Sequence, residues 1–123
     1  MLRYLSTADI CLDPNPSSPL NDVSTWIKVM EYGSCRSRVV SFDLKETRIS
    51  AADAALYATP NDEAAFARAI VRLMDDPVKR RDMGDYGRAR VINDLSWHVT
   101  SRNLLAAYAF LFATPSASSP FDR

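Results

Sequence analysis

Residues 21–43 read NDVSTWIKVMEYGSCRSRVVSFD, and this stretch decides the fold. Apolar and polar residues alternate with helical spacing over residues 23–35, which predicts a helix. The run over residues 39–44 is apolar and rich in β-branched and aromatic side chains, which predicts a strand buried on both faces. A similar short run at residues 10–13 predicts an earlier strand. The order strand, loop, helix, strand is typical of a parallel α/β unit.

Further elements follow along the chain. Residues 2–7 resemble the last turns of a helix, and residues 55–57 are expected to form another short strand. Asp62 is a good amino-terminal cap for a helix that ends near residue 74, with Phe66, Ile70, Leu73 and Met74 on its buried face. A charged helix is predicted over residues 78–91 and an apolar one over residues 96–112. The Pro- and Ser-rich tail, residues 114–123, is expected to be disordered.

The sequence predicts close packing at two glycines and a core-facing side for one helix. Gly84 and Gly87 interrupt the charged helix and lower its propensity, so close packing is the expected reason for them. Met83, Tyr86 and Gly87 are expected to turn inward there. In the helix at residues 23–35 the predicted core face holds Trp26, Ile27 and Met30, and Asp22 or Ser24 is the expected cap.

Composition narrows the function classes. The chain has 123 residues, 47% of them hydrophobic, which is enough for one modest core, and 15 basic residues balance 15 acidic ones. With zero formal charge, we expect no nucleic-acid partner and no broad attraction to an anionic membrane. Cys11 and Cys35 have no metal-ligand spacing, so buried free thiols are predicted, and neither a metal nor a cofactor is expected. No signal sequence or membrane span is recognisable, which favours a cytoplasmic location.

The loop that follows the first strand is the predicted binding region. It lies at the carboxyl end of a parallel strand and before a helix, where α/β proteins bind ligands, most often phosphates. Lys28 and Glu31 share one helical face, three residues apart, and the simplest interpretation is a surface ion pair. In this context they also suit a nucleotide sugar: a carboxylate accepts hydrogen bonds from both ribose hydroxyls, and a lysine neutralises a diphosphate. The loop adds the short polar side chains of Ser24 and Thr25.

These residues carry a family resemblance. Lys28-Val29-Met30-Glu31-Tyr32 followed by Val39-Val40-Ser41-Phe42-Asp43 resembles the carboxyl-terminal half of retaining glycosyltransferases of the GT-B fold, in the large family 4 group. Later segments, among them Asp75-Asp76-Pro77, resemble that group more weakly. The resemblance spans residues 4–108 and implies that residues 1–113 are part of a nucleotide-sugar, or donor, binding domain.

The resemblance also implies roles and departures. Glu31 matches the glutamate that binds the ribose hydroxyls, and Lys28 matches a lysine of one branch of the family. A second acidic position of the family falls on Val23, so sugar contact is assigned to the neighbouring Asp22 by a shift of one residue. Arg36 and Arg38 stand where the family has Gly and Pro in a tight turn, which predicts backbone strain, because a Cβ disfavours positive φ.

The predicted fold is therefore α/β: half of a doubly wound, Rossmann-like parallel sheet of about three strands, with flanking helices and a carboxyl-terminal helix. The family's acceptor domain and the first strands of its donor domain have no counterpart here. We therefore expect a glycosyltransferase-like fragment that does not turn over alone, with catalytic residues unassigned and a bare edge on the first strand. The alternative is a non-catalytic interaction module that associates with itself or with a complementary chain.

Overall fold

The computed structural model describes residues 2–113, which form a three-stranded parallel sheet flanked by helices. The strands are β1 (Ile10–Asp13), β2 (Arg38–Phe42) and β3 (Ala55–Ala58), in the order β1-β2-β3. Leu12 of β1 lies opposite Val40 of β2, which lies opposite Leu56 of β3. The predicted fold class is confirmed. The predicted tail, residues 114–123, lies outside the described residues.

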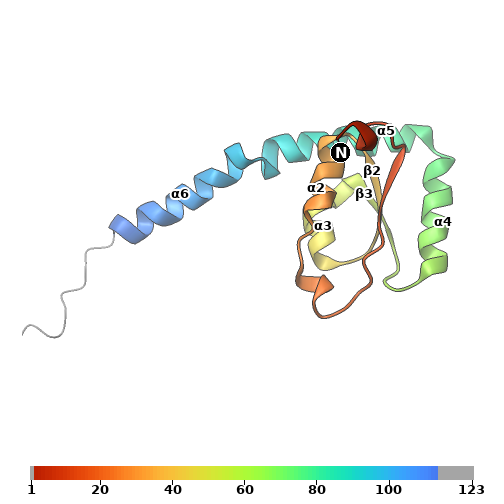
Figure 1. Ribbon diagram of the computed structural model, residues 1–123, viewed down its shortest axis with the longest axis horizontal. Helices are drawn as coiled ribbons and strands as arrows, with labels where there is room; N and C mark the ends of the chain where they lie inside the picture. Colours follow the sequence, from red (N-terminus) through yellow and green to blue (C-terminus); the bar gives the residue numbers. More distant parts are fainter. Residues whose placement is uncertain (1, 114–123) are drawn as a thin grey trace, which may run out of the picture.

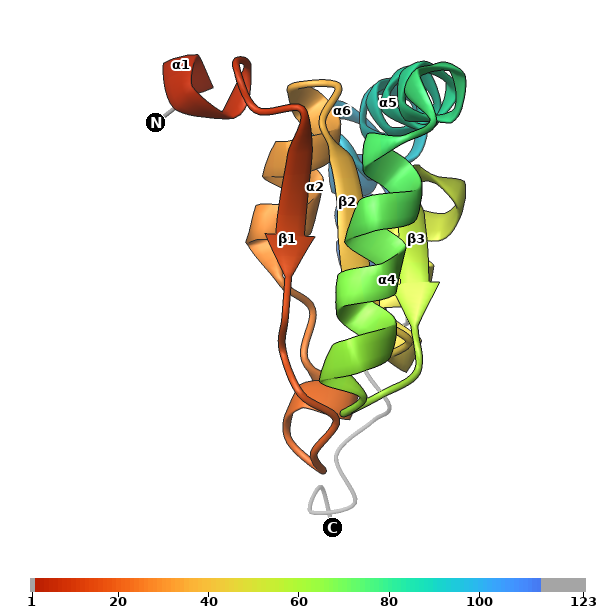
Figure 2. The ribbon, with the colours of Figure 1, turned by 90° about the vertical axis from the view of Figure 1, so that its right-hand side faces the viewer.

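Helices cover both faces of this sheet. They are α1 (Leu2–Leu5), α2 (Ile27–Ser34), α3 (Lys45–Ala51), α4 (Glu63–Met74), α5 (Pro77–Arg90) and α6 (Trp97–Ala113), with short turns η1 (Asn21–Val23), η2 (Ala52–Ala54) and the π-helical η3 (Val91–Leu95). Helix α4 lies on one face of the sheet, α2 and α3 lie on the other, and α5 crosses the amino ends of the strands (Figure 2). The carboxyl ends of the strands are therefore free of this crossing helix.

Strand β2 is the centre of the core. Its side chains alternate between two apolar clusters: Val40 and Phe42 pack with Phe66 and Leu73 of α4, whereas Val39 packs on the α2 side. A strand buried on both faces reads as a continuous apolar run, which is why the sequence revealed it. The prediction for β2 is confirmed.

Helix α4 follows its sequence signals closely. Asp62 is the cap, and its carboxylate accepts a hydrogen bond from the backbone N–H of Ala65 at 2.8 Å. Phe66 and Leu73 are buried as predicted, but Met74 is 61% exposed, and Ala69 is buried instead. Met74 is the last residue of the helix, one position past the buried stripe, so its side chain turns towards solvent.

Helix α2 is shorter than predicted and buries a different face. It begins at Ile27, because residues 21–23 form the separate turn η1, and Trp26 precedes the helix in an extended conformation without a side-chain cap. The buried residues are Val29 and Gly33, whereas Ile27 is 69% exposed. The expected cap is also wrong, since the Ser24 hydroxyl donates to the Leu20 carbonyl and so stabilises η1.

The close packing predicted for the glycines of α5 is confirmed. A Cβ on Gly84 would collide with the backbone carbonyl of Arg36, and one on Gly87 would lie 3.0 Å from the Cβ of Ala54. Met83 is buried as predicted, but Tyr86 is 38% exposed, a correction to the predicted inward face. Both glycines face inward: Gly84 lies against the turn that precedes β2, and Gly87 lies against α2 and η2.

Helix α6 extends away from the rest of the molecule (Figure 1). It contains no buried residue, although it is largely apolar. Over the described residues, no helix combines the length and apolar character needed to cross a membrane.

Candidate functional site

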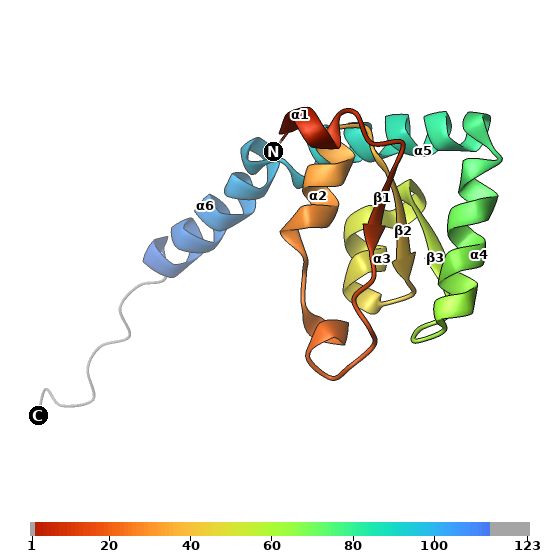
Figure 3. The same ribbon diagram turned by 45° about the vertical axis from the view of Figure 1, so that its right-hand side comes forward.

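The predicted binding loop runs along the carboxyl edge of the sheet. It leaves β1 at Asp13, descends past the ends of the strands to η1 and returns to α2 (Figure 3). This is the edge at which open α/β sheets bind their ligands. The position expected from the sequence is therefore the position found.

Hydrogen bonds fasten this loop to its neighbour between β3 and α4. The Ser17 backbone N–H donates to Asn61 Oδ1 at 2.7 Å, and Asn61 Nδ2 donates to the Ser17 carbonyl at 3.2 Å. Asn61 has a left-handed backbone, with φ 61°, which asparagine tolerates better than most residues. The Ser17 hydroxyl also donates to the Asp22 carboxylate at 3.0 Å. Asp22, predicted to contact a sugar, thus holds the loop in this structure.

Asp13 is the buried charge of the site. Its side chain is fully buried, and one carboxylate oxygen lies 2.8 Å from Lys28 Nζ and accepts a hydrogen bond from Asn15 Nδ2 at 2.6 Å. The second oxygen accepts from the Ser41 hydroxyl at 3.3 Å. Asp13 is not among the site residues predicted from the sequence. An acidic residue at the end of an otherwise apolar strand was the available signal.

The five predicted site residues have different surroundings. Lys28 pairs with Asp13 rather than with Glu31, so the simple surface pair between Lys28 and Glu31 is not formed. Thr25 donates to Glu46 of α3 at 3.0 Å, and Ser24 stabilises η1. Within residues 2–113, no side-chain hydrogen bond or ion pair joins any two of these five residues. The Glu31 carboxylate takes part in no side-chain hydrogen bond or ion pair within the same residues. Lys28 and Glu31 lie three residues apart on α2 without contacting each other through an ion pair, and the Glu31 carboxylate is available to a ligand.

The pKa of the Tyr32 phenol is raised by its surroundings on α2. Burial raises the pKa of its phenol, and the negative charges of Cys11 as thiolate, Asp13 and Glu31 raise it further. The Tyr32 hydroxyl donates to the Leu12 carbonyl at 3.4 Å. The carboxylates of β1 and α2 therefore act on one region, beside the carboxyl end of β1.

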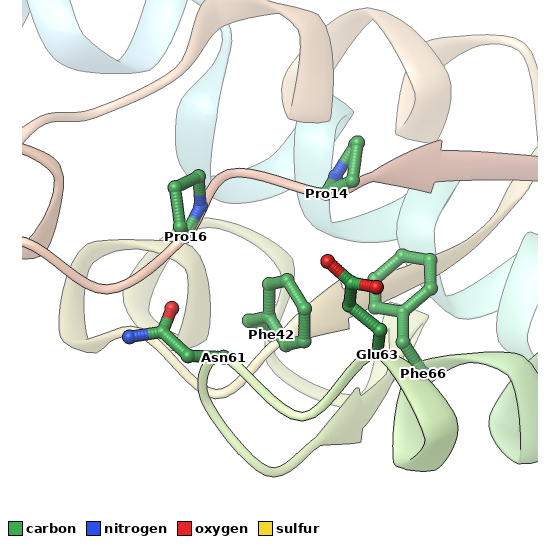
Figure 4. Close-up of a pocket in the computed structure, with 6 residues that line it drawn as sticks. All are labelled: Pro14, Pro16, Phe42, Asn61, Glu63 and Phe66. Carbon is green, nitrogen blue, oxygen red and sulfur yellow. The ribbon is translucent and has the colours of Figure 1, made fainter.

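A cavity opens between the loop that follows β1 and helix α4, on the face of the sheet that α4 covers. Its volume is about 440 Å³, and Figure 4 shows its lining, formed by Pro14, Pro16, Phe42, Asn61, Glu63 and Phe66. None of the five predicted site residues lines it. No sequence pattern predicts this cavity, because its walls come from two loops, the end of β2 and the start of α4, which are distant along the chain.

Cysteine and acidic side chains are possible metal ligands. Cys11 is buried, as predicted, and burial raises the pKa of its thiol, whereas Cys35 is only half-buried. Over residues 2–113, no three His, Cys, Asp or Glu side chains gather in a metal-ligand arrangement.

The turn between α2 and β2 is strained as predicted. Arg36 has φ 58°, the left-handed region that glycine occupies without cost. Its side chain forms an exposed ion pair with Asp85 at 3.6 Å. Arg38 begins β2, and its guanidinium donates to the Arg80 carbonyl of α5. Both arginines thus contact α5.

The fold defines a class: it is half of a Rossmann-like parallel α/β domain, with a polar loop at the carboxyl edge of its sheet. Among solved structures, the chain is similar to a sucrose-phosphate synthase from Thermosynechococcus elongatus, a GT-B enzyme, at 27% sequence identity and a TM-score of 0.78. The match covers 89% of this chain and 27% of the synthase chain. No protein-family model and no curated protein matches the sequence. The predicted resemblance to a carboxyl-terminal GT-B part is confirmed, and the chain has a glycosyltransferase-like fold.

Proposed function

We propose that this chain forms part of the nucleotide-sugar binding site of a GT-B glycosyltransferase. The observation that carries the proposal is the match to sucrose-phosphate synthase over 89% of the chain, with Lys28 and Glu31 on the helix that follows the binding loop. The chain spans 27% of the synthase's length. Transfer of a glycosyl group to an acceptor is therefore proposed only for an assembly in which a complementary chain supplies the remaining groups, and no turnover is expected from the chain alone.

The chemistry assigned to each residue follows from its surroundings. The Glu31 carboxylate has no hydrogen-bond or ion-pair partner in the described part of the chain, so both oxygens are available to the two hydroxyls of a ribose. Lys28 stands one turn earlier on the same helix and supplies a cation for the diphosphate. Asp22, Ser24 and Thr25 contribute the polar rim of the loop, where a sugar would lie.

The test is thermal unfolding of the purified chain with and without millimolar UDP, GDP and ADP. At about 100 times its dissociation constant, a bound nucleotide stabilises the native state by about 2.7 kcal/mol, which is readily seen as a higher melting temperature. We expect one nucleotide to give this shift and Glu31→Ala to abolish it. Glu63→Gln is the matched control, because it removes an acid from the cavity on the opposite face and should leave the shift intact.

A second candidate function is the non-catalytic interaction module. Two observations favour it: α6 exposes its apolar side chains, and β1 has no strand on its outer side within the described residues. Self-association that rises with concentration, in a chain that shows no response to any nucleotide, would favour this function over donor binding.

A further inference from the structure

Asp13 is a carboxylate from which water is excluded, at the carboxyl end of β1. Its side chain has 0% exposure, and it is held by Lys28 at 2.8 Å, Asn15 at 2.6 Å and Ser41 at 3.3 Å. Burying a charged carboxylate is costly unless a cation and hydrogen-bond donors compensate it. Groups from α2, the binding loop and β2 supply this compensation, and they fix the carboxylate from three sides.

The same contacts determine where the Lys28 ammonium lies. An ammonium has three N–H donors, and one of them points to Asp13 Oδ1. The Lys28 side chain remains 32% exposed, and its ammonium lies 5.3 Å from the centre of the Trp26 ring. A lysine side chain is otherwise a flexible four-carbon stem. The ion pair with Asp13 thus holds the partly exposed Lys28 ammonium beside the carboxyl edge of the sheet. The remaining N–H donors of this ammonium are left for a ligand.

We propose that Asp13 is a positioning residue of the nucleotide-sugar binding site. It holds the Lys28 ammonium where that group donates to a phosphate oxygen of a nucleoside diphosphate. This inference rests on the proposed function. Asp13 itself does not touch the ligand, since its carboxylate is buried beneath Lys28 and Asn15.

A purely structural ion pair makes a different prediction. If the pair only joined β1 to α2, removing the Asp13 charge would lower the melting temperature and leave the affinity of the folded protein unchanged. If Asp13 positions Lys28, the affinity falls as well, and it falls only while Lys28 is present.

The experiment measures nucleotide affinity calorimetrically on the full chain, with UDP, GDP and ADP as probes. Wild type, Asp13→Asn, Lys28→Met and the double variant are compared, and the melting temperature of each is recorded. We expect each single variant to bind about tenfold more weakly, and the double variant to bind no more weakly than the weaker single variant. Asp43→Asn is the matched control: Asp43 also follows a strand and pairs with an arginine, and its loss should leave affinity unchanged.

Three results would overturn the inference. A folded Asp13→Asn protein with wild-type affinity would do so, as would losses that multiply in the double variant; both leave the proposed function standing. Failure of wild type to bind any of the probes would overturn the proposed function and this inference with it. Should Asp13→Asn not fold, Asn15→Ala replaces it, because Asn15 donates to the same oxygen as Lys28. It is expected to weaken binding about threefold at a nearly unchanged melting temperature, and unchanged affinity would contradict the inference.

Discussion

Arg36 occupies the left-handed region of backbone space in the turn that joins α2 to β2. For a residue with a Cβ this conformation costs about 1–2 kcal/mol, whereas glycine adopts it freely. The ion pair that Arg36 makes with Asp85 joins two exposed side chains and offsets little of this cost. The turn is thus held by its surroundings, including the close approach of Gly84 to the Arg36 carbonyl.

Replacing Arg36 with glycine should stabilise the protein. Relief of the strain, less the greater unfolded-state entropy of glycine, predicts a gain of about 0.5–1 kcal/mol in the free energy of unfolding. Urea denaturation measures it. Arg36→Ala is the control, since it loses the charge but keeps the Cβ, and it should stay near wild type. An equal gain in both variants would show that the charge, not the backbone, is responsible.

Tyr57 links stability to alkaline pH. Burial raises the pKa of its phenol from 10.0 to about 12, and its hydroxyl donates to the Ala52 carbonyl at 2.8 Å. The folded state therefore favours the neutral phenol. The stabilisation is complete below the unfolded pKa near 10 and is lost as pH rises through about 12.

Tyr57→Phe tests this linkage. The variant should be about 1 kcal/mol less stable than wild type at neutral pH, because the hydrogen bond to Ala52 is lost. The difference between the two proteins should shrink as pH rises from 10 towards 12, when wild type loses its advantage. Urea unfolding at several pH values gives the difference, and phenolate absorbance gives the titration. A difference that is constant with pH would contradict the assigned pKa.

At the scale of elements, the crossing of α2 and α5 is set by glycines. A Cβ on Gly33 would lie 3.0 Å from the Val91 side chain and 3.2 Å from the Gly87 carbonyl oxygen. Gly84 faces the Arg36 carbonyl even more closely. Helix α5 can therefore lie against the start of β2, where the Arg38 guanidinium reaches the Arg80 carbonyl.

Gly84→Ala should destabilise the protein despite the better helix propensity of alanine. The propensity gain is about 1 kcal/mol, but the added methyl collides with rigid backbone, and overpacking of this kind costs about 1–3 kcal/mol or more. We expect a net loss of about 1–2 kcal/mol in the free energy of unfolding, measured by urea denaturation. Asp82→Ala, at an exposed position of the same helix, is the control and should change stability little. A stabilised Gly84→Ala protein would mean that α5 moves aside without cost.

At the scale of the whole molecule, α6 is an apolar helix that does not pack into the core. Its apolar residues include Leu104, Leu105, Tyr108, Leu111 and Phe112, and all are exposed. The Tyr108 and Phe112 rings stack on each other, with centroids 6.2 Å apart, rather than on the body of the protein. Such an apolar helix face is characteristic of an interaction surface.

We therefore predict self-association through α6 if the interaction-module function holds. Sedimentation velocity over a range of concentrations should show dimers or larger species, and the pair Leu104→Glu and Leu111→Glu, on one helix face, should abolish them. The pair Asn103→Glu and Ala106→Glu adds the same charge on the opposite side and should not. A wild-type monomer at every concentration would argue against self-association.

Sequence alone determined the strands, the capped helix α4 and the position of the binding loop. These features depend on local patterns: a continuous apolar run in β2, an Asp62 cap, and polar residues after a strand. The family resemblance identified the strained turn, because Arg36 stands where the family has a glycine. Helix α3 was not predicted, since Thr47 and Ser50, two polar residues, are buried in it and break the amphipathic pattern.

Only the tertiary structure decided which side chains meet. Lys28 and Glu31 share a helix face, so their spacing indicated a pair, but Asp13 lies closer to Lys28 once β1 packs beside α2. The cavity and the fastening of Ser17 to Asn61 likewise join segments far apart along the chain. Periodicity along the chain determines secondary structure, whereas a buried charge takes whichever partner packing brings to it, and that choice depends on contacts that no local pattern encodes.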